Sequence, residues 1–192
     1  MTSVAALERD AQLMLRVREG DAESFALLLE RHRTPVIHFL YRMIQNQAVA
    51  EELAQETFLR VYRSRESYEP TAKFTTWLFR IATHLALNWL RDHKNSRGEV
   101  ALDEPSDGFP TLQVAHREAS VEQRLVKESK AAEVRRAIGS LPQKQRGAVL
   151  MHKYQEMEYR QIATALKCSE SAVKSLLFRA YETLRTRLAH MA

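Results

Sequence analysis

The chain has 192 residues, of which 45% are hydrophobic and 28% charged, and its formal net charge at pH 7 is +5. Because domains usually hold roughly 100–150 residues, this length and composition exclude a large multidomain enzyme and a disordered polyelectrolyte. Glycine and proline together make up about 5% of the chain, against roughly 12% in average proteins. Since β-sheet proteins need many tight turns, this scarcity predicts an all-α fold.

The N-terminal residues, MTSVAALERD, lack the basic start and apolar run of a signal peptide. No apolar stretch approaches the roughly 18 residues of a membrane span, so we expect a cytoplasmic protein without membrane insertion. Cys168 is the single cysteine, which excludes an intrachain disulfide and a cysteine-rich zinc site. A semi-buried turn residue is a better interpretation of Cys168 than a redox sensor.

Charge is divided unevenly along the chain. Lys and Arg number 13 against 12 Asp and Glu in residues 1–95, 2 against 5 in residues 96–119, and 14 against 7 in residues 120–192. The middle stretch also holds two of the five glycines and two of the five prolines. It therefore predicts a flexible acidic linker between two helical domains, of which the second is strongly basic.

The first predicted helix follows Asp21 and carries apolar residues at three- and four-residue steps from Phe25 to Met43. Pro35 lies inside this pattern and predicts a bend.

A second helix, predicted over residues 48–64, has a polar side that carries Glu52, Gln55, Glu56 and Leu59. Because no Glu-x-x-His motif accompanies the two glutamates, a di-iron site is disfavoured. A solvated acidic face remains an alternative, but Leu59 is an apolar residue within the polar side and favours a protein-binding face.

A proline-containing loop, ESYEPTAK, leads into a third helix, on which a largely basic stripe repeats at steps of three and four residues: Arg80, His84, Leu87, Arg91 and Lys94. The aromatic residues Tyr68, Phe74 and Trp77 lie near its start. Cations beside exposed rings suit single-stranded nucleic acid, which needs phosphate contacts and base stacking. A solvated basic face is the alternative for the stripe, and core packing is favoured for the rings taken alone.

In the basic domain, a helix over residues 120–139 is predicted to end with Gly139 as its C-cap. Farther on, YRQIATALKCSESAVKSLLFRAYETLRTRL has two apolar helical patterns separated by three residues, which is the spacing of a helix-turn-helix. Ser169 is expected to cap the second of these helices. Because the turn has Lys167 and Cys168 where many such motifs have glycine, one of them is expected to adopt a positive φ.

In a helix-turn-helix, the N-terminal residues of the second helix meet base edges in the major groove. Here those residues are Ser169, Glu170, Ser171, Lys174, Ser175 and Phe178 or Arg179. The alternative is a helical hairpin with charged outer residues, which the domain's excess of seven basic over acidic residues disfavours.

Four stretches, in this order, resemble the extracytoplasmic-function (ECF) group of bacterial RNA polymerase sigma factors. AEELAQETFLRVYR is similar to the core-binding helix of the group, and FTTWLFRIATHLALNWLRDHK to its promoter-melting and minus-ten-reading helix. LPQKQR is similar to the start of its second domain, and EYRQIATALKCSESAVKSLLFRAYETLR to its minus-thirty-five reader. The resemblance implies sigma region 2 in residues 1–95 and sigma region 4 in residues 120–192.

The residue patterns and the resemblance together give three candidate sites. Core polymerase, through the clamp helices of its largest subunit, is expected to bind Glu52, Gln55, Glu56 and Leu59. Minus-ten DNA, with a flipped base in the loop of residues 66–73, is expected to bind Tyr68, Lys73, Phe74, Trp77, Arg80, His84, Asn88 and Arg91. Minus-thirty-five DNA is expected to bind Ser169, Ser171, Lys174, Ser175, Phe178 and Arg179.

These observations predict a sigma factor that binds core RNA polymerase and directs promoter-specific initiation, with promoter DNA and an anti-sigma factor as further partners. No enzyme activity, cofactor or metal is expected, because there is no His-Glu-x-x-His motif and no phosphate-binding glycine motif. The alternative is a helix-turn-helix regulator that binds duplex DNA without polymerase. A helical adaptor that binds no nucleic acid is disfavoured by the basic C-terminal domain.

Overall fold

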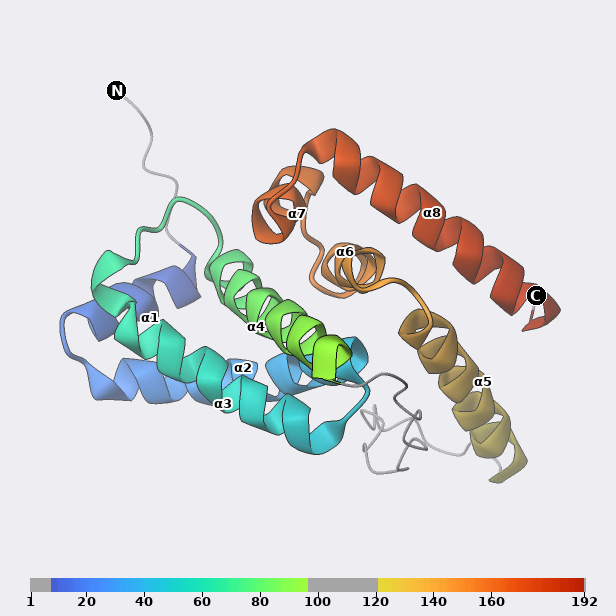
Figure 1. Cartoon of the computed structure of the whole chain (residues 1–192). Coiled ribbons are helices and arrows are strands. Elements are labelled where there is room, and N and C mark those ends of the chain that lie inside the picture. The colour runs from blue at the N-terminus through green and yellow to red at the C-terminus, as the bar shows by residue number, and fades with distance from the viewer. Residues whose placement is uncertain (1–7, 97–120, 192) are drawn as a thin grey trace.

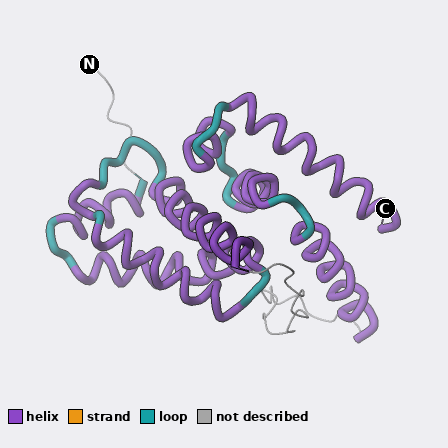
Figure 2. The backbone as a smooth tube through the Cα atoms, in the orientation of Figure 1, coloured by secondary structure: helices purple, strands orange, loops and turns teal. Residues whose placement is uncertain are grey.

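A computed structural model describes residues 8–96 and 121–191 of the chain, which form helices and loops without strands (Figure 2). The helices form two domains, α1–α4 and α5–α8 (Figure 1). Their bounds are α1 Arg9–Arg18, α2 Ala22–Ile44, α3 Gln47–Arg63, α4 Phe74–Ser96, α5 Val121–Gly139, α6 Gln143–Tyr154, α7 Tyr159–Leu166 and α8 Glu170–Leu188, with 3-10 turns at η1 Arg65–Ser67 and η2 Ala189–Met191. The all-α prediction is confirmed. The predicted linker lies outside the described residues, except for Ser96.

The helix α1 has no counterpart among the predicted elements, which begin after Asp21. It buries Leu13, Met14 and Val17 against the rest of the N-terminal domain. These three residues have helical spacing, so the sequence did carry an apolar helical pattern here, but over little more than one turn.

A buried ionic cluster attaches α1 to α2. Asp10 is almost fully buried, and its Oδ2 lies 2.8 Å from Nε2 of His32. Its other carboxylate oxygen accepts a hydrogen bond from Arg31. Since a buried carboxylate is costly unless it is paired, these contacts fix the position of α1.

The helix α2 begins where the sequence predicts and continues on both sides of Pro35. Oδ1 of Asp21 caps its start by accepting hydrogen bonds from the backbone N–H groups of Glu23 and Ser24, at 2.9 and 3.2 Å. These hydrogen bonds satisfy two of the N–H groups that a helix start leaves without partners.

The core of the N-terminal domain lies between α2 and α4. The rings of Phe39 and Phe79 meet edge to face with their centroids 5.2 Å apart. Leu28, Leu40 and Leu78 are also fully buried in this domain. The three-residue and four-residue steps of apolar residues in both helices are therefore explained by one shared core.

The helix-turn-helix prediction is confirmed by α7 and α8. Oγ of Ser169 accepts a hydrogen bond from the backbone N–H of Ala172 at 3.1 Å, as expected for a cap. Lys167 has φ 51°, so the expected positive φ lies at this residue of the turn. Cys168 is half-buried beside it.

The prediction that Gly139 is a left-handed C-cap is wrong, because Gly139 is the last residue of α5 and does not have a positive φ. Among the described glycines, positive φ occurs at Gly20. A Cβ built on Gly139 would lie 3.4 Å from Cδ of Gln45, the C-cap residue of α2. A methyl group at this position would therefore make an ordinary van der Waals contact with Gln45.

The two domains pack against each other. One cluster of buried side chains extends through both of them, and α4 contacts α6 and α7 while α2 contacts α5 and α6. The guanidinium of Arg146 crosses the boundary, because it donates hydrogen bonds to the carbonyls of Met43 in α2 and of Gly139 in α5. This contact joins the ends of α2 and α5 and so helps to place the two domains relative to each other.

Replacing Phe39 with alanine should lower the free energy of unfolding by about 3–5 kcal/mol, since it removes the ring that joins α2 to α4. Urea denaturation followed by circular dichroism measures this change. Leu27→Ala is the matched control, because Leu27 is 49% exposed on the same helix and its loss should cost no more than about 0.5 kcal/mol. Equal losses in the two variants would contradict the described core.

Candidate functional site

The polar side of α3 faces solvent. Glu52, Gln55 and Leu59 are exposed, and Leu59 leaves 49% of its surface open. Oε1 of Glu56 lies 2.7 Å from Nε of Arg60, one turn along the helix. This surface pair keeps the Glu56 carboxylate near the exposed face, although pairs of this kind contribute only about 0.3–0.5 kcal/mol to stability.

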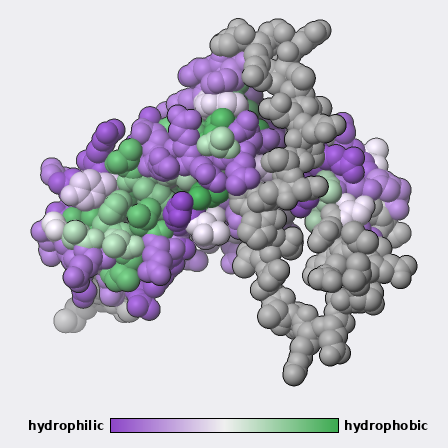
Figure 3. Space-filling model, turned by 90° about the horizontal axis from the view of Figure 1, so that it is seen from below, coloured by the Kyte–Doolittle hydropathy of each residue, from purple (hydrophilic) through white to green (hydrophobic). Residues whose placement is uncertain are grey.

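Apolar side chains that were not predicted as part of this face lie near it. Tyr62 is 43% exposed, and its ring packs on Phe25 of α2 with centroids 5.1 Å apart. The guanidinium of Arg65 lies 4.4 Å from the Tyr62 ring centroid. Hydrophobic surface gathers on this underside of the N-terminal domain (Figure 3). Tyr62 follows Leu59 by three residues, and this helical spacing could have placed it on the same face of α3 from the sequence.

The rings of Tyr68 and Phe74 are buried, with exposures of 2% and 0%. Their assignment to exposed, base-stacking positions is therefore wrong for this arrangement, and the alternative of core packing is correct. The Tyr68 ring packs on Trp77 at 4.9 Å and on Phe74 at 6.3 Å. The area of aromatic surface removed from water explains why both rings turn inward.

The hydroxyl of Tyr68 is buried and has no hydrogen-bond partner among the described residues. Burial, together with the nearby carboxylates of Glu8 and Asp10, raises the pKa of Tyr68 to about 12. The phenol is thus neutral and contributes packing rather than charge to this loop. Trp77 remains half-buried at its edge.

The remaining minus-ten candidates lie at the start of α4 or along one side of it. Lys73, Asn88 and Arg91 are exposed, and Arg80 is half-buried. Nε of Arg91 lies 3.2 Å from Oδ1 of its neighbour Asp92. The structure thus places these polar groups on α4 or directly before it, with Lys73, Asn88 and Arg91 open to solvent.

His84, in the middle of the stripe, contacts the C-terminal domain. Its Nε2 donates to the backbone carbonyl of Ala165 in α7 at 2.7 Å. Burial lowers the pKa of His84, and the positive charges of Lys167 and Arg80 lower it further, while the hydrogen bond to Ala165 acts in the opposite direction. His84 is therefore a neutral interdomain residue in this structure.

The predicted minus-thirty-five residues are all on the exposed side of α8 and its cap. Lys174, Phe178 and Arg179 are exposed, and Phe178 leaves 69% of its surface open. Ser169, Ser171 and Ser175 are also exposed. Such a row of cations and small polar groups, with one large ring, can meet phosphates, base edges and thymine methyl groups.

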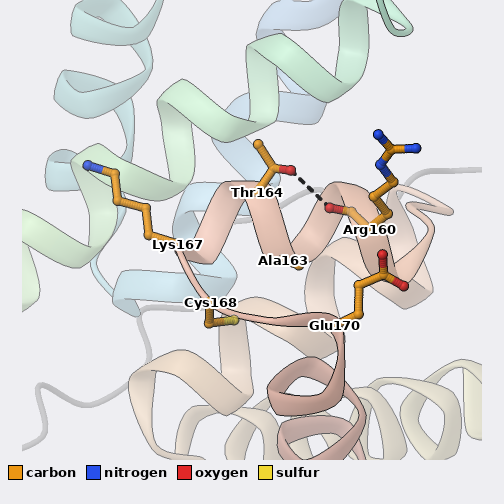
Figure 4. A pocket seen from close by; sticks show the side chains of 6 residues that line it. All are labelled: Arg160, Ala163, Thr164, Lys167, Cys168 and Glu170. Carbon is orange, nitrogen blue, oxygen red and sulfur yellow. Dashed lines mark hydrogen bonds between the residues drawn. The ribbon is translucent and has the colours of Figure 1, made fainter.

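An open hollow of about 570 Å³ lies at the turn between α7 and α8 (Figure 4). Its lining side chains come from both helices and the turn: Arg160, Ala163, Thr164, Lys167, Cys168 and Glu170. Two cations and a single carboxylate give it a positive balance, and no imidazole lines it to activate the thiol. The hollow therefore fits the surface of a DNA-binding motif better than a catalytic pocket.

Within residues 8–96 and 121–191 there is no group of three His, Cys, Asp or Glu side chains that could hold a metal ion. None of the described helices combines the length and hydrophobicity that a membrane-spanning segment needs.

Two family descriptions match the chain in the order expected from its helices. Residues 28–96 match Sigma-70 region 2, and residues 131–184 match Sigma-70, region 4. The first covers most of α2 through α4, and the second covers the helix-turn-helix. The chain belongs to the ECF group of RNA polymerase sigma factors. It is thus a sigma factor that directs transcription initiation.

Curated relatives match this sigma factor over nearly their whole length. The RNA polymerase sigma-H factor of Pseudomonas aeruginosa is 29% identical over 182 residues, which cover 92% of each chain. The ECF RNA polymerase sigma-E factor of Escherichia coli is 29% identical, with 93% of this chain and 94% of that protein covered. The ECF sigma factor SigW of Bacillus subtilis is also 29% identical, with 90% and 93% covered.

Solved structures share the fold. CnrH in complex with the cytosolic domain of CnrY has a TM-score of 0.67 at 20% identity, over 96% of this chain and all of that chain. The Bartonella quintana sigma factor RpoE in complex with the anti-sigma factor NepR also has a TM-score of 0.67 at 20% identity, over 88% and 98%. The two-domain helical architecture is therefore that of known sigma factors.

The pKa of His84 should lie below its usual value of about 6.5 in the folded sigma factor and return to it in 8 M urea. The unfolded chain then binds the His84 proton at a higher pH, so stability falls as the pH drops below about 6.5. Nuclear magnetic resonance of the ring protons, assigned with a His84→Gln variant, measures both values. A folded pKa at or above the unfolded one would contradict the burial of the His84 ring in this interface.

Proposed function

We propose that three helices divide the work of this sigma factor. The helix α3 holds core RNA polymerase, α4 engages the minus-ten strand, and α8 reads the minus-thirty-five duplex. The observation that carries the proposal is that one chain matches region 2 and region 4, and that α8 has its polar residues exposed. Transcription from a promoter library with purified core polymerase tests it, since it requires all three surfaces together.

The polymerase-binding role of α3 is supported by its mixture of charge and apolar surface. Glu52, Gln55 and Glu56 supply the acidic and polar groups, and Leu59 supplies an exposed apolar anchor. Interfaces combine such an anchor with a polar rim. Tyr62 extends the apolar part and joins the proposed face.

The DNA-binding roles are supported by charge and exposure. Lys73, Asn88 and Arg91 are open to solvent on α4 or next to it, and Arg80 and His84 continue the same stripe. Half-buried Trp77 is the remaining aromatic candidate there. On α8 the proposed contacts with the minus-thirty-five element come from one exposed face: Ser169, Ser171, Lys174, Ser175, Phe178 and Arg179.

The division into region 2 over residues 1–95, an acidic linker over residues 96–119 and region 4 over residues 120–192 belongs to the same proposal. We propose further that this sigma factor acts in the cytoplasm and has no catalytic activity of its own, because catalysis of transcription belongs to the polymerase. An anti-sigma partner is proposed as well, since the similar sigma factor RpoE was solved with the anti-sigma factor NepR.

The second candidate is a helix-turn-helix regulator that binds duplex DNA without polymerase. The exposed α8 would serve it equally well, but such a regulator has no need for the face of α3. Copurification discriminates the two functions, because a sigma factor is recovered with core polymerase and a regulator is not.

Replacing Glu56 with lysine should weaken core polymerase binding by about 2 kcal/mol or more, because an unpaired or like charge at an interface is costly. Competition with a fluorescent sigma factor for purified core enzyme measures the affinity. Glu19→Lys makes the same charge change at the exposed end of α1 and should leave the affinity unchanged. If Glu56→Lys competes as well as the parent, the α3 assignment is wrong.

Replacing Lys174 with alanine should weaken binding to the minus-thirty-five element by about 1–3 kcal/mol if the side chain contacts a base. If it contacts a phosphate, binding to specific and nonspecific duplexes should fall alike, with a smaller salt dependence. Fluorescence anisotropy on both duplexes at two salt concentrations separates these results. Lys153→Ala, at an exposed position of α6, is the control, and an equal loss there would refute a specific role for α8.

A further inference from the structure

We infer that α1 is a positioning element for the minus-ten strand, because it holds both ends of the loop that precedes α4. This loop comprises residues 69–73, between Tyr68 and Phe74. Glu8 and Arg18, at the two ends of α1, are the positioning residues. The inference rests on the proposed role of α4 in engaging that strand. It adds the part of the chain that keeps the adjoining loop in one conformation.

The C-terminal end of the loop is held by Glu8. Its Oε2 accepts a hydrogen bond from the backbone N–H of Phe74 at 3.3 Å. Phe74 is the first residue of α4, so this N–H is one of those that a helix start leaves without a partner. The first turn of α4 contains no acidic residue of its own. The Glu8 carboxylate therefore supplies, from another helix, the negative charge that stabilises a helix start.

The Glu8 side chain is free for this contact because α1 does not use it. Glu8 is the N-cap residue of α1, but its side chain makes no capping hydrogen bond in that helix. An N-cap position favours Ser, Thr, Asp or Asn, whose short side chains reach the N–H groups of their own helix. The contact with α4 explains why a longer acidic side chain lies here instead.

The N-terminal end of the loop is held by Arg18, in the last turn of α1. Its Nη1 donates a long hydrogen bond, of 3.4 Å, to the backbone carbonyl of Tyr68. The backbone N–H of Tyr68 donates to the carbonyl of Arg65 at 3.2 Å and closes the 3-10 turn before the loop. The Tyr68 carbonyl and the Phe74 N–H bracket the loop, and α1 forms a hydrogen bond with each of them.

The helix α1 can act as a fixed support because it is anchored to α2. The buried Asp10 carboxylate pairs with Arg31 and His32, so moving α1 would leave a buried charge without its partners. The His32 ring also lies beside the ring of Phe74, with the centroids 5.4 Å apart. Phe74 is thus held through its backbone by α1 and through its ring by α2.

The loop depends on this support because its own contacts are local. Within it, the backbone N–H of Thr71 donates to the carbonyl of Glu69 at 2.8 Å, two residues back. Glu69, Thr71, Ala72 and Lys73 are exposed. Fixing the backbone of one residue changes an equilibrium constant by about 5- to 30-fold. A loop whose ends are already held loses less entropy when a strand binds, so α1 raises the affinity by preorganisation.

Substitutions at both ends of α1 test the two contacts. Glu8→Ala and Arg18→Ala remove them, whereas Glu8→Gln and Arg18→Lys keep an acceptor and a donor. Glu19→Ala and Arg16→Ala are the matched controls, because they remove the same side chains from exposed positions near the C-terminal end of α1. Circular dichroism establishes that each full chain folds, and Arg18→Ala decides if Glu8→Ala does not fold.

Hydrogen exchange followed by mass spectrometry measures the order of the loop in the free chain. In both alanine variants the amides of residues 68–74 should exchange about tenfold faster than in the parent, because the held ends of the loop are released. The controls should exchange at the parental rate. Glu8→Gln and Arg18→Lys should recover most of the protection.

Promoter opening is then measured with each full chain bound to purified core polymerase. The template is a promoter that the parent selects from the library, with 2-aminopurine in the nontemplate strand of its minus-ten element. Fluorescence rises as the bases unstack. Both alanine variants should open this promoter about tenfold more slowly, in proportion to the lost order of the loop. Their competition for core polymerase should stay parental, since the proposed binding face lies on α3.

Unchanged exchange of residues 68–74 in the folded alanine variants would overturn the inference, and so would faster exchange of the loop without slower opening. Faster exchange spread evenly over α1 to α4 would also overturn it, because Glu8 and Arg18 would then only stabilise the domain. A parent chain that neither binds core polymerase nor opens a promoter would instead refute the proposed function, and the exchange of the loop would still decide whether α1 orders it.

Discussion

The arrangement of this molecule depends on one half-buried cation at the point where two helices end. Arg146 comes from α6, yet its guanidinium donates to carbonyls at the ends of α2 and α5 and in the following turn. Burial lowers the pKa of Arg146, but a guanidinium remains charged under all physiological conditions. Its desolvation is offset by charge-assisted hydrogen bonds to carbonyls that would otherwise lack partners.

The proposed surfaces of the sigma factor differ in how far they are open to solvent. The acidic face of α3 and the proposed recognition face of α8 are open, whereas α7 lies on the N-terminal half of α4. The contact combines a continuous apolar cluster with a few polar groups, including His84 and Gln161. Contacts between domains of one chain that are partly polar are typically reversible. Reversibility is what a factor needs when its two DNA elements lie apart on a promoter.

The aromatic residues near the start of α4 illustrate how packing limits function. Tyr68 and Phe74 are fully enclosed with Trp77 at their edge, and the buried Tyr68 hydroxyl lacks a hydrogen-bond partner among the described residues. A buried hydroxyl of this kind costs about 1–3 kcal/mol. The cost is small beside the burial of two rings, so packing decides their position. The loop is thus a rigid support for the neighbouring cations rather than a row of open stacking platforms.

The sequence by itself determined the local features of this protein. Helical spacing located α2, α3, α4 and the helix-turn-helix, Ser169 was recognised as a cap, and Lys167 was one of two residues expected to have positive φ. These features depend on residues a few positions apart, whose interactions are fixed by the helix period and by turn geometry. The exposure of Leu59 and Phe178 could be predicted for the same reason.

The tertiary structure alone decided which faces meet. The sequence marks Arg80 and His84 as members of a stripe, but it cannot say that Ala165, 81 residues beyond His84, covers them. Gly139 is a residue type that favours a left-handed C-cap, yet in the structure it is the last residue of α5 and lies beside Gln45 of α2. Aromatic residues such as Tyr68 and Phe74 can pack in a core or stack on bases at a surface. Which of these occurs depends on the neighbours that other helices contribute. Long-range contacts are set by the sum of many weak packing terms, and no local pattern encodes that sum.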